Sequence, residues 1–206
     1  MKITRTANAG VLLTIDGVSI LLDGVCGEHP PYRGTPSSIR QNLEETFPDI
    51  LAFTHHHPDH YDGEFAELYR KATNRPVFEP PFCETIKVGN VEFYGVESRH
   101  LGRSDQPHIS FIIKGTECVW FLGDASPNSI KKIEGLPKPD VVIVPYAYAN
   151  TESSFETTKG FGAKDIIILH LPENKLDEYK ICETVNGVIK DYPFVHLIEI
   201  GESLIL

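Results

Sequence analysis

Residues 54 to 60 of the sequence are Thr54-His55-His56-His57-Pro58-Asp59-His60, and five of these seven residues can bind a metal ion. The apolar run Ile50-Leu51-Ala52-Phe53 precedes the stretch and predicts a buried strand. After the stretch comes a helical pattern in which one face carries Phe65, Leu68, Tyr69 and Ala72. The sequence therefore predicts a strand-to-helix loop that carries imidazoles, which suit Zn, Fe, Cu or Ni, and a harder carboxylate ligand.

The spacing within this loop predicts two ions rather than one. His55 and His57 alternate, so in an extended segment both imidazoles can lie on one side. Asp59 and His60 follow directly and can face a second ion. The alternative is a polar histidine run in a surface loop, because His-rich tracts also bind metal adventitiously. The flanking apolar elements favour a binuclear metal site.

The composition is that of a soluble globular chain. The 206 residues are 41% hydrophobic and 23% charged, which predicts a single domain over residues 1–206 with a substantial core. The net charge of −10 argues against nucleic acid as a partner, since such binding needs clustered Lys and Arg. The oligomeric state is not defined by these features.

Neither a leader nor a membrane anchor is expected. The start, Met1-Lys2-Ile3-Thr4-Arg5, lacks the apolar region of a signal peptide, and no apolar run is long enough to span a bilayer.

The four cysteines are widely scattered without a CxxC pair, which favours reduced thiols in the cytoplasm. Of these, only Cys26 is considered near a site, and a small loop residue is the favoured interpretation.

Hairpins and buried strands organise the rest of the chain. Residues 10–23 predict a hairpin around Asp16-Gly17, and residues 108–124 predict another, each ending in an Asp. This likeness suggests an internally duplicated architecture, although two hairpins can also match by chance. Helices are expected from a cap at Ser37 or Ser38 to Glu45, and over 127–133 and 155–161. A last helix is expected to bury Leu176, Tyr179, Cys182, Val185 and Ile189.

Four apolar strands end in a candidate metal ligand. The pairs of strand end and ligand are Phe53 and His55, Val96 and His100, Leu122 and Asp124, and Leu169 and His170. Strand ends are positions where a rigid sheet holds ligands without covering them. The coincidence of four such ends carries more weight than any single histidine.

With these residues in view, the sequence resembles the metallo-β-lactamase superfamily of metal-dependent hydrolases. The resemblance rests on the T-H-x-H-x-D-H motif at 54–60, His100, Gly123-Asp124 and His170-Leu171-Pro172, together with Asn8-Ala9-Gly10 and Leu21-Leu22-Asp23. It spans residues 8 to 172, and only the first motif is specific by itself. It implies an α/β fold, the four-layer αβ/βα sandwich of that superfamily.

The resemblance also implies a role for each ligand. A first metal would be held by His55, His57 and His100, and a second by Asp59, His60 and His170, with Asp124 bridging both. Asp23 would orient a ligand histidine. His108 lies near His100 in the sequence and is either a substrate-side acid or hydrogen-bond donor, or a polar residue that starts a strand. His100 is favoured as the ligand because Arg99-His100 follows a strand directly.

The implied activity is hydrolysis. Two divalent ions, most simply Zn with Mn or Fe as alternatives, share a water and generate a bridging hydroxide that attacks a carbonyl or phosphoryl centre. Asp59 and Asp124 would then accept protons. The predicted partner is a small-molecule substrate, an ester, lactone or phosphodiester, and an anionic group on it would meet Arg33, Arg99 or Arg103.

Features that the chain lacks argue against several branches of the superfamily. Asp124 stands where the best-known β-lactamases use a Cys ligand, and the chain lacks room for the added domains of the glyoxalase II, tRNA-processing, β-CASP and flavin-linked branches. A minimal enzyme similar to ascorbate-6-phosphate lactonase remains. The alternatives are a mononuclear iron oxidoreductase similar to persulfide dioxygenase, and a metal-binding protein without catalysis.

Overall fold

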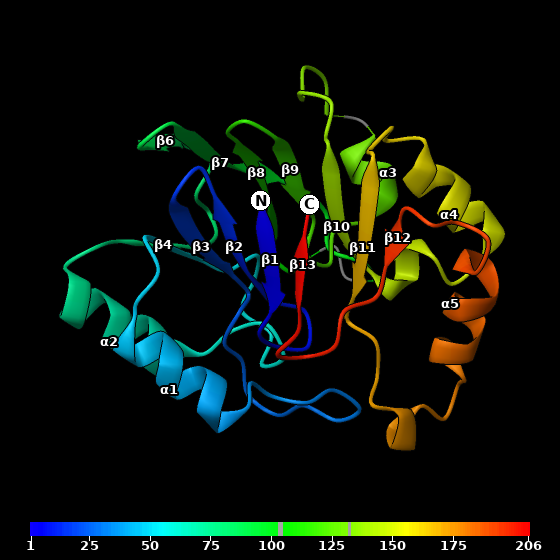
Figure 1. Cartoon of the computed structure of the whole chain (residues 1–206), viewed down its shortest axis with the longest axis horizontal. Helices are drawn as coiled ribbons and strands as arrows, with labels where there is room; N and C mark the ends of the chain where they lie inside the picture. The colour runs from blue at the N-terminus through cyan, green and yellow to red at the C-terminus, as the bar shows by residue number, and fades with distance from the viewer. Residues whose placement is uncertain (103–104, 132) are drawn as a thin grey trace.

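The computed structural model describes residues 1–102, 105–131 and 133–206, and it places two β-sheets face to face (Figure 1). The six-stranded sheet has the order β13-β1-β2-β3-β4-β5, and the seven-stranded sheet has the order β12-β11-β10-β9-β8-β7-β6. The first sheet contains β1 (Lys2–Arg5), β2 (Val11–Ile15), β3 (Val18–Leu22), β4 (Ile50–Ala52), β5 (Val77–Phe78) and β13 (Ser203–Ile205). The second contains β6 (Thr85–Val88), β7 (Val91–Glu97), β8 (Ile109–Lys114), β9 (Cys118–Phe121), β10 (Val141–Pro145), β11 (Asp165–Leu169) and β12 (Val195–His196).

Helices cover the outer face of each sheet (Figure 1). The first sheet is covered by α1 (Ser37–Glu45) and α2 (Gly63–Thr73), whose Leu43, Phe65 and Tyr69 pack against Leu21 and Leu51. The second is covered by α3 (Pro127–Ile130), α4 (Glu152–Lys159) and α5 (Ile181–Ile189), with short 3-10 turns η1 (Tyr146–Tyr148) and η2 (Asn174–Leu176). The predicted four-layer αβ/βα sandwich is confirmed.

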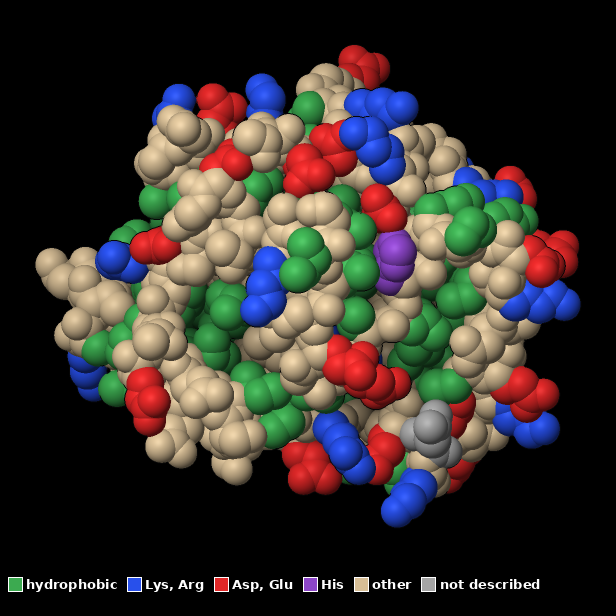
Figure 2. Space-filling view, viewed as in Figure 1, with side chains coloured by type: hydrophobic (Ala, Val, Ile, Leu, Met, Phe, Trp, Pro, Cys, Tyr) green, Lys and Arg blue, Asp and Glu red, His purple; other side chains and the backbone are tan. Residues whose placement is uncertain are grey.

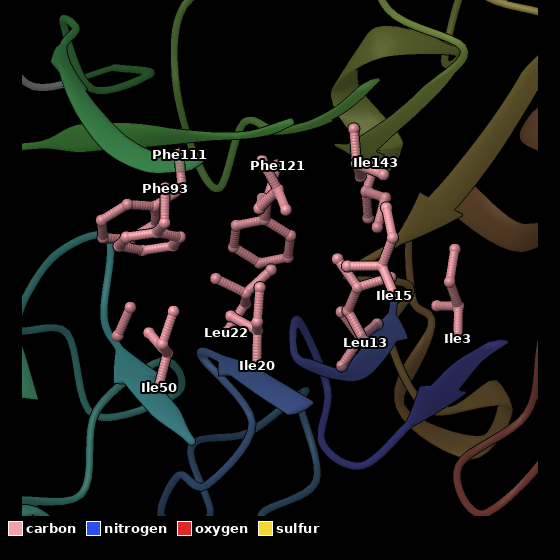
Figure 3. Packing of buried hydrophobic residues seen from close by; sticks show 14 of the residues in the cluster. Ile3, Leu13, Ile15, Ile20, Leu22, Ile50, Phe93, Phe111, Phe121 and Ile143 are labelled. Atoms are coloured by element: carbon pink, nitrogen blue, oxygen red, sulfur yellow. The ribbon is translucent and has the colours of Figure 1, made fainter. Parts of the chain in front are cut away.

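The main core lies between the two sheets. Figure 3 shows Phe121 of the second sheet pointing toward Ile20 and Leu22 of the first, and Phe93 and Phe111 pointing toward Ile50. The rings of Phe93 and Phe111 stack with their centroids 5.0 Å apart. All five residues of β10 are buried, as expected for a strand with an apolar layer on each face. This core fixes the two sheets and therefore the relative positions of their strand ends.

The two sheets repeat the same pattern of strand pairing. In β1 to β5 the successive pairings are antiparallel, antiparallel, parallel and parallel. The series β7 to β11 repeats this order. Asp23 follows β3 and Asp124 follows β9, so the two residues occupy equivalent places. The repeat supports a duplicated architecture and brings the ends of β7, β9 and β11 to one edge of the second sheet.

The first hairpin has the turn that its sequence predicts. Asp16 and Gly17 both have positive φ angles, +50° and +78°, which a type I′ turn requires. Their flanking strands pair in register from Ile15 with Val18 to Val11 with Leu22. The local sequence alone is therefore enough to define this pairing.

Two details of the first helical layer differ from the prediction. The residue before α1 is Pro36, and no side chain caps this helix, so the predicted Ser cap is wrong. In α2, Leu68 is 39% exposed, whereas Ala66 is buried with Phe65. The helix begins at Asp62, whose carboxylate accepts from the backbone N–H of Phe65 at 2.8 Å, and this start sets which side chains face the sheet.

The second helical layer also differs in its boundaries. α4 begins earlier than expected, because Thr151 and Ser154 form a capping box at its start. α5 begins only at Ile181, so Leu176 and Tyr179 lie outside it and are exposed rather than buried. Val185 and Ile189 are buried as predicted. The predicted helix was therefore too long at its N-terminal end.

The surface shows mixed charge. On the face drawn in Figure 2, acidic and basic side chains are interspersed, and no broad basic field is visible. Among the described residues, no helix combines the length and apolar character that crossing a bilayer requires.

Candidate metal centre

The predicted ligands come together at the strand ends. His55, His57, Asp59 and His60 lie in the segment between β4 and α2. The remaining ligands follow the ends of β7, β9 and β11, and are His100, Asp124 and His170. A β-bridge between His100 and Ala125, and a 2.7 Å hydrogen bond from the Leu101 N–H to the Asp124 carbonyl, tie two of these ends together.

One group of three imidazoles surrounds a common point. The Nε2 atom of His55 lies 3.0 Å from Nδ1 of His57 and 3.3 Å from Nε2 of His100. The donor atoms of all three side chains lie within 4.8 Å of one another. Three nitrogens that converge in this way can hold one metal ion.

A second group combines a carboxylate with two imidazoles. Asp59, His60 and His170 have their donor atoms within 4.8 Å of one another, and Asp59 Oδ2 lies 3.2 Å from His170 Nε2. The Oδ2 atom of Asp124 lies 3.6 Å from Nε2 of His60 and 3.6 Å from Nε2 of His100. This oxygen faces both groups, as a bridging ligand must.

Asp23 lies behind the site and accepts the hydrogen bonds that orient neighbouring side chains. It is fully buried, and its Oδ2 accepts from His60 Nδ1 at 2.8 Å and from the Thr54 hydroxyl at 2.7 Å. Its Oδ1 accepts from the Thr54 backbone N–H at 2.7 Å. Because the Thr54 hydroxyl proton goes to Asp23, the Thr54 oxygen accepts from His55 Nδ1, 2.9 Å away. In their neutral forms, His55 and His60 therefore carry the proton on Nδ1, and Asp23 orients both rings so that the Nε2 lone pair faces the site.

His100 has the same tautomer for a different reason. Its Nδ1 donates to the Leu101 carbonyl at 2.5 Å, which leaves the Nε2 lone pair for the site. The Nε2 atoms of His60 and His170 are buried without a hydrogen-bond partner among the described residues. Because such an orphaned group costs about 1–3 kcal/mol, these nitrogens fit a metal ion.

The charges also fit a cation. Burial disfavours the charged form of His60, but Asp124, Asp23 and Asp59 outweigh it and raise its pKa to about 9. Burial, aided by the neighbouring imidazoles, lowers the pKa of His55, which is therefore neutral, the form in which an imidazole can bind a metal ion. The carboxylates thus make this buried space favourable for positive charge, which divalent ions would supply.

The backbone at two of these positions is strained. Asp23 and His170 have φ angles of +46° and +63°, values that non-glycine residues rarely adopt and that cost about 1–3 kcal/mol each. Gly123 has a φ of +51°, and a Cβ atom there would lie 2.6 Å from the Thr54 side chain. Gly123 therefore allows Asp124 to approach the residues that follow β4.

His108 lies close to the ligands but in neither group. It is 3% exposed, and its ring centroid is 5.2 Å from that of His55 and 5.7 Å from that of His100. Its Nδ1 lies 2.8 Å from the Ser98 hydroxyl, which contacts Ser110. Because Ser110 donates to a backbone carbonyl, Ser98 donates to Ser110 and accepts from His108. Burial lowers the pKa of His108 to about 3.

Other candidate residues lie elsewhere. His56 is exposed and bonds to Glu79, and His196 bonds to Asp165. Burial raises the pKa of the Cys26 thiol to about 11, so it is not a thiolate nucleophile. Of the arginines considered for an anionic substrate, Arg33 pairs with Glu173, Arg99 is exposed, and Arg103 lies outside the described residues.

The structure adds two aromatic residues at the site. The ring of Tyr32 meets His170 edge-on with centroids 4.2 Å apart, and the ring of Tyr146 lies 6.2 Å from the same histidine. Tyr32 lies in the loop between β3 and α1, whereas Tyr146 was not singled out in the sequence. Its position directly after β10 is the signal that would have indicated it.

Comparisons with known proteins agree with this geometry. A family model described as a β-lactamase superfamily domain matches residues 2–167. A UPF0173 metal-dependent hydrolase from Methanopyrus kandleri is 25% identical over 186 residues, 77% of each chain.

Two solved structures share the fold. One is described as a possible metal-dependent hydrolase from Veillonella parvula, with a TM-score of 0.75 and 16% identity over 100% of this chain and 99% of that one. The other is CmlA, a diiron β-hydroxylase from Streptomyces venezuelae, with a TM-score of 0.64 and 15% identity over 100% of this chain and 54% of that one. The fold and the family match together show that the chain belongs to the metallo-β-lactamase superfamily.

Proposed function

We propose that the chain is a metal-dependent hydrolase with a binuclear centre. His55, His57 and His100 hold one ion, and Asp59, His60 and His170 hold the other. The observation that carries this proposal is the position of Asp124 Oδ2, 3.6 Å from a ligand nitrogen of each group. His-rich ligation favours Zn, and the bridging carboxylate also admits Mn or Fe.

When bound by these residues, two divalent ions would supply a water whose pKa is lowered toward about 7 and positive charge to stabilise the substrate's developing negative charge. The protein itself orients the ligands and accepts protons. Burial opposes ionisation of Asp59, but His170 and His60 outweigh it and hold the pKa of this carboxyl below its usual value. Asp124 is ionised for the same reason. Both carboxylates are therefore present as anions, the form that binds a metal ion. Because their pKa values are low, any proton that they accept during turnover would be held only transiently.

The substrate class is a small ester, lactone or phosphodiester. Tyr32 and Tyr146 beside His170 support a small organic substrate, because aromatic rings supply apolar contact next to the polar centre. Arg99 is an exposed cation next to His100 and suits an anionic group on the substrate. The scattered free cysteines support a cytoplasmic location.

An iron oxidoreductase is the second candidate, and the shared fold with a diiron β-hydroxylase favours it. The two functions are separated by assaying metal-free protein after reloading with Zn, Mn or Fe(II). The assay uses a panel of esters, lactones and phosphodiesters, with dissolved oxygen recorded in parallel. Hydrolysis should depend on metal and consume no oxygen. Oxygen uptake, or bound metal without turnover on any substrate, would contradict the proposed function.

His108 is assigned to positioning rather than proton donation. Its neutral ring packs beside His55 and His100, so His108→Asn should weaken metal binding and lower activity by about 10-fold. Metal titration and kcat/KM check this, with His29→Asn in an exposed loop as the matched control. If His108 instead donates a proton to the substrate, kcat falls while metal affinity stays at the wild-type value.

A further inference from the structure

Arg5, at the end of β1, is a buried cation that forms no ion pair with a described carboxylate. Arg5 is only 7% exposed, and no described carboxylate oxygen lies within 4.0 Å of its guanidinium nitrogens. Its Nε donates to the Ala7 carbonyl at 3.2 Å, Nη1 to that of Ile198 at 2.9 Å, and Nη2 to that of Asn8 at 2.9 Å. Since a guanidinium has five N–H groups, two remain for a ligand.

A cavity of about 390 Å³ opens beside this guanidinium. Asn8, which is 1% exposed, also lines it, and the side-chain nitrogen of Asn8 has no partner among the described residues. Arg33 and Lys175 contribute further positive charge to its lining. Two acids line it as well. Glu173 is paired with Arg33, and Glu199 opposes the effect of burial by raising the pKa of Arg5, but it lies too far away for an ion pair within 4.0 Å.

We propose that this cavity binds a small molecule through a carboxylate or phosphate group, which Arg5 and the Asn8 amide recognise. The fork of a guanidinium matches two oxygens of such an anion. A buried cation is costly when it has no counter-charge, and an anion offsets that cost. The volume lies within the range of small-molecule sites, about 300–1,000 Å³.

The cavity is separate from the metal centre but touches the segment that carries one of its ligands. Leu171 and Pro172, which line it, follow His170 directly. The His170 N–H donates to the Asn8 carbonyl at 3.2 Å. None of the seven proposed metal ligands lines the cavity. An occupant would therefore contact residues next to His170 while leaving the metal centre open.

The test uses the whole chain, freed of metal and then dialysed free of chelator, so that anions cannot bind through a metal, no chelator carboxylate competes for the cavity, and the result is independent of the proposed hydrolysis. Inorganic phosphate and acetate are titrated separately by calorimetry. At least one is expected to bind one-to-one with a Kd of about 1 mM or tighter. Comparison of the two Kd values shows whether the cavity prefers a phosphate or a carboxylate group. Arg5→Lys should weaken this binding about 10-fold, because the planar fork is lost. Arg75→Lys, at an exposed arginine paired with Asp49, should leave it unchanged.

Cysteine labelling gives a second readout. It uses the wild-type protein, so it does not require that a variant folds. Cys182 lines the cavity and Cys83 is exposed elsewhere, so Cys83 is an internal reference. Alkylation of wild-type Cys182, measured by mass spectrometry, should slow saturably with the anion at the midpoint found by calorimetry. The proposal is overturned if neither anion changes the Cys182 rate relative to Cys83, or if Arg5→Lys binds as tightly as wild type.

Discussion

Replacing Asp124 with alanine is expected to lower kcat/KM by more than about 100-fold and to abolish loading of two metal ions per chain. Loss of a residue that only supports a ligand costs about 10–100-fold, and Asp124 is placed as a ligand to both ions. Its Oδ2 is the one oxygen within 3.8 Å of His60, His100 and His170 among the described carboxylates of the site. Activity and metal content are measured on the same protein sample.

A matched control is Asp191→Asn, an exposed position in the loop before β12, which should leave both quantities unchanged. Circular dichroism of both variants checks that the fold is retained. The bridging assignment is refuted if Asp124→Ala still binds two ions per chain with wild-type affinity.

Replacing Asp23 with asparagine is expected to weaken metal binding by about 10–100-fold, although Asp23 would not touch either ion. Its Oδ2 accepts from His60 and from the Thr54 hydroxyl, and its Oδ1 accepts from the Thr54 N–H. An amide can accept at only one of these two positions, because its nitrogen is a donor. If the amide nitrogen takes the place of Oδ2, His60 and the Thr54 hydroxyl lose their acceptor; if it takes the place of Oδ1, the Thr54 N–H does. Either arrangement disturbs the orientation of the rings that face the site.

The measurement is a competition titration of Zn against a chelator at fixed pH. The effect of Asp23→Asn on metal affinity should exceed its effect on the KM for the substrate, since Asp23 is fully buried behind the ligands. Unchanged Zn affinity in a folded Asp23→Asn protein would show that the tautomers are set by other groups.

The gathering of the candidate ligands in one place could be predicted from the sequence, because these residues follow strand ends. His55, His57, Asp59 and His60 lie in one short segment, so local spacing already defines half of the two groups. The other half required the order of the sheets, which the resemblance supplied and which the repeated strand pairing explains. Tyr146 beside His170 was missed, because its only signal was its place directly after a buried strand, and its contact with His170 depends on the fold.

Helix boundaries were less predictable, because caps override side-chain periodicity. The start of α5 is the clearest case. The carboxylate of Asp177 accepts from the N–H groups of Ile181 and Cys182 at 2.7 and 2.8 Å, and Lys180 has a left-handed φ of +53°. The chain therefore turns sharply before Ile181, and Tyr179 is left 85% exposed despite its helical spacing.

The cavity at Arg5 could not be predicted from the sequence either. Arg5 and Ile198 are joined by a hydrogen bond although they lie near opposite ends of the chain. The pairing of β1 with β13 brings these ends together. Only the folded chain shows that the arginine is buried, that it lacks an acidic partner among the described residues, and that it borders a cavity.

The number of metal ions bound per folded chain tests the central claim most directly. Metal-free protein is titrated with Zn, and the bound metal is measured by mass spectrometry after free ion is removed. The account predicts saturation at two ions per chain, with the second ion lost in Asp124→Ala. Saturation of the wild-type protein at one ion per chain would contradict a binuclear centre.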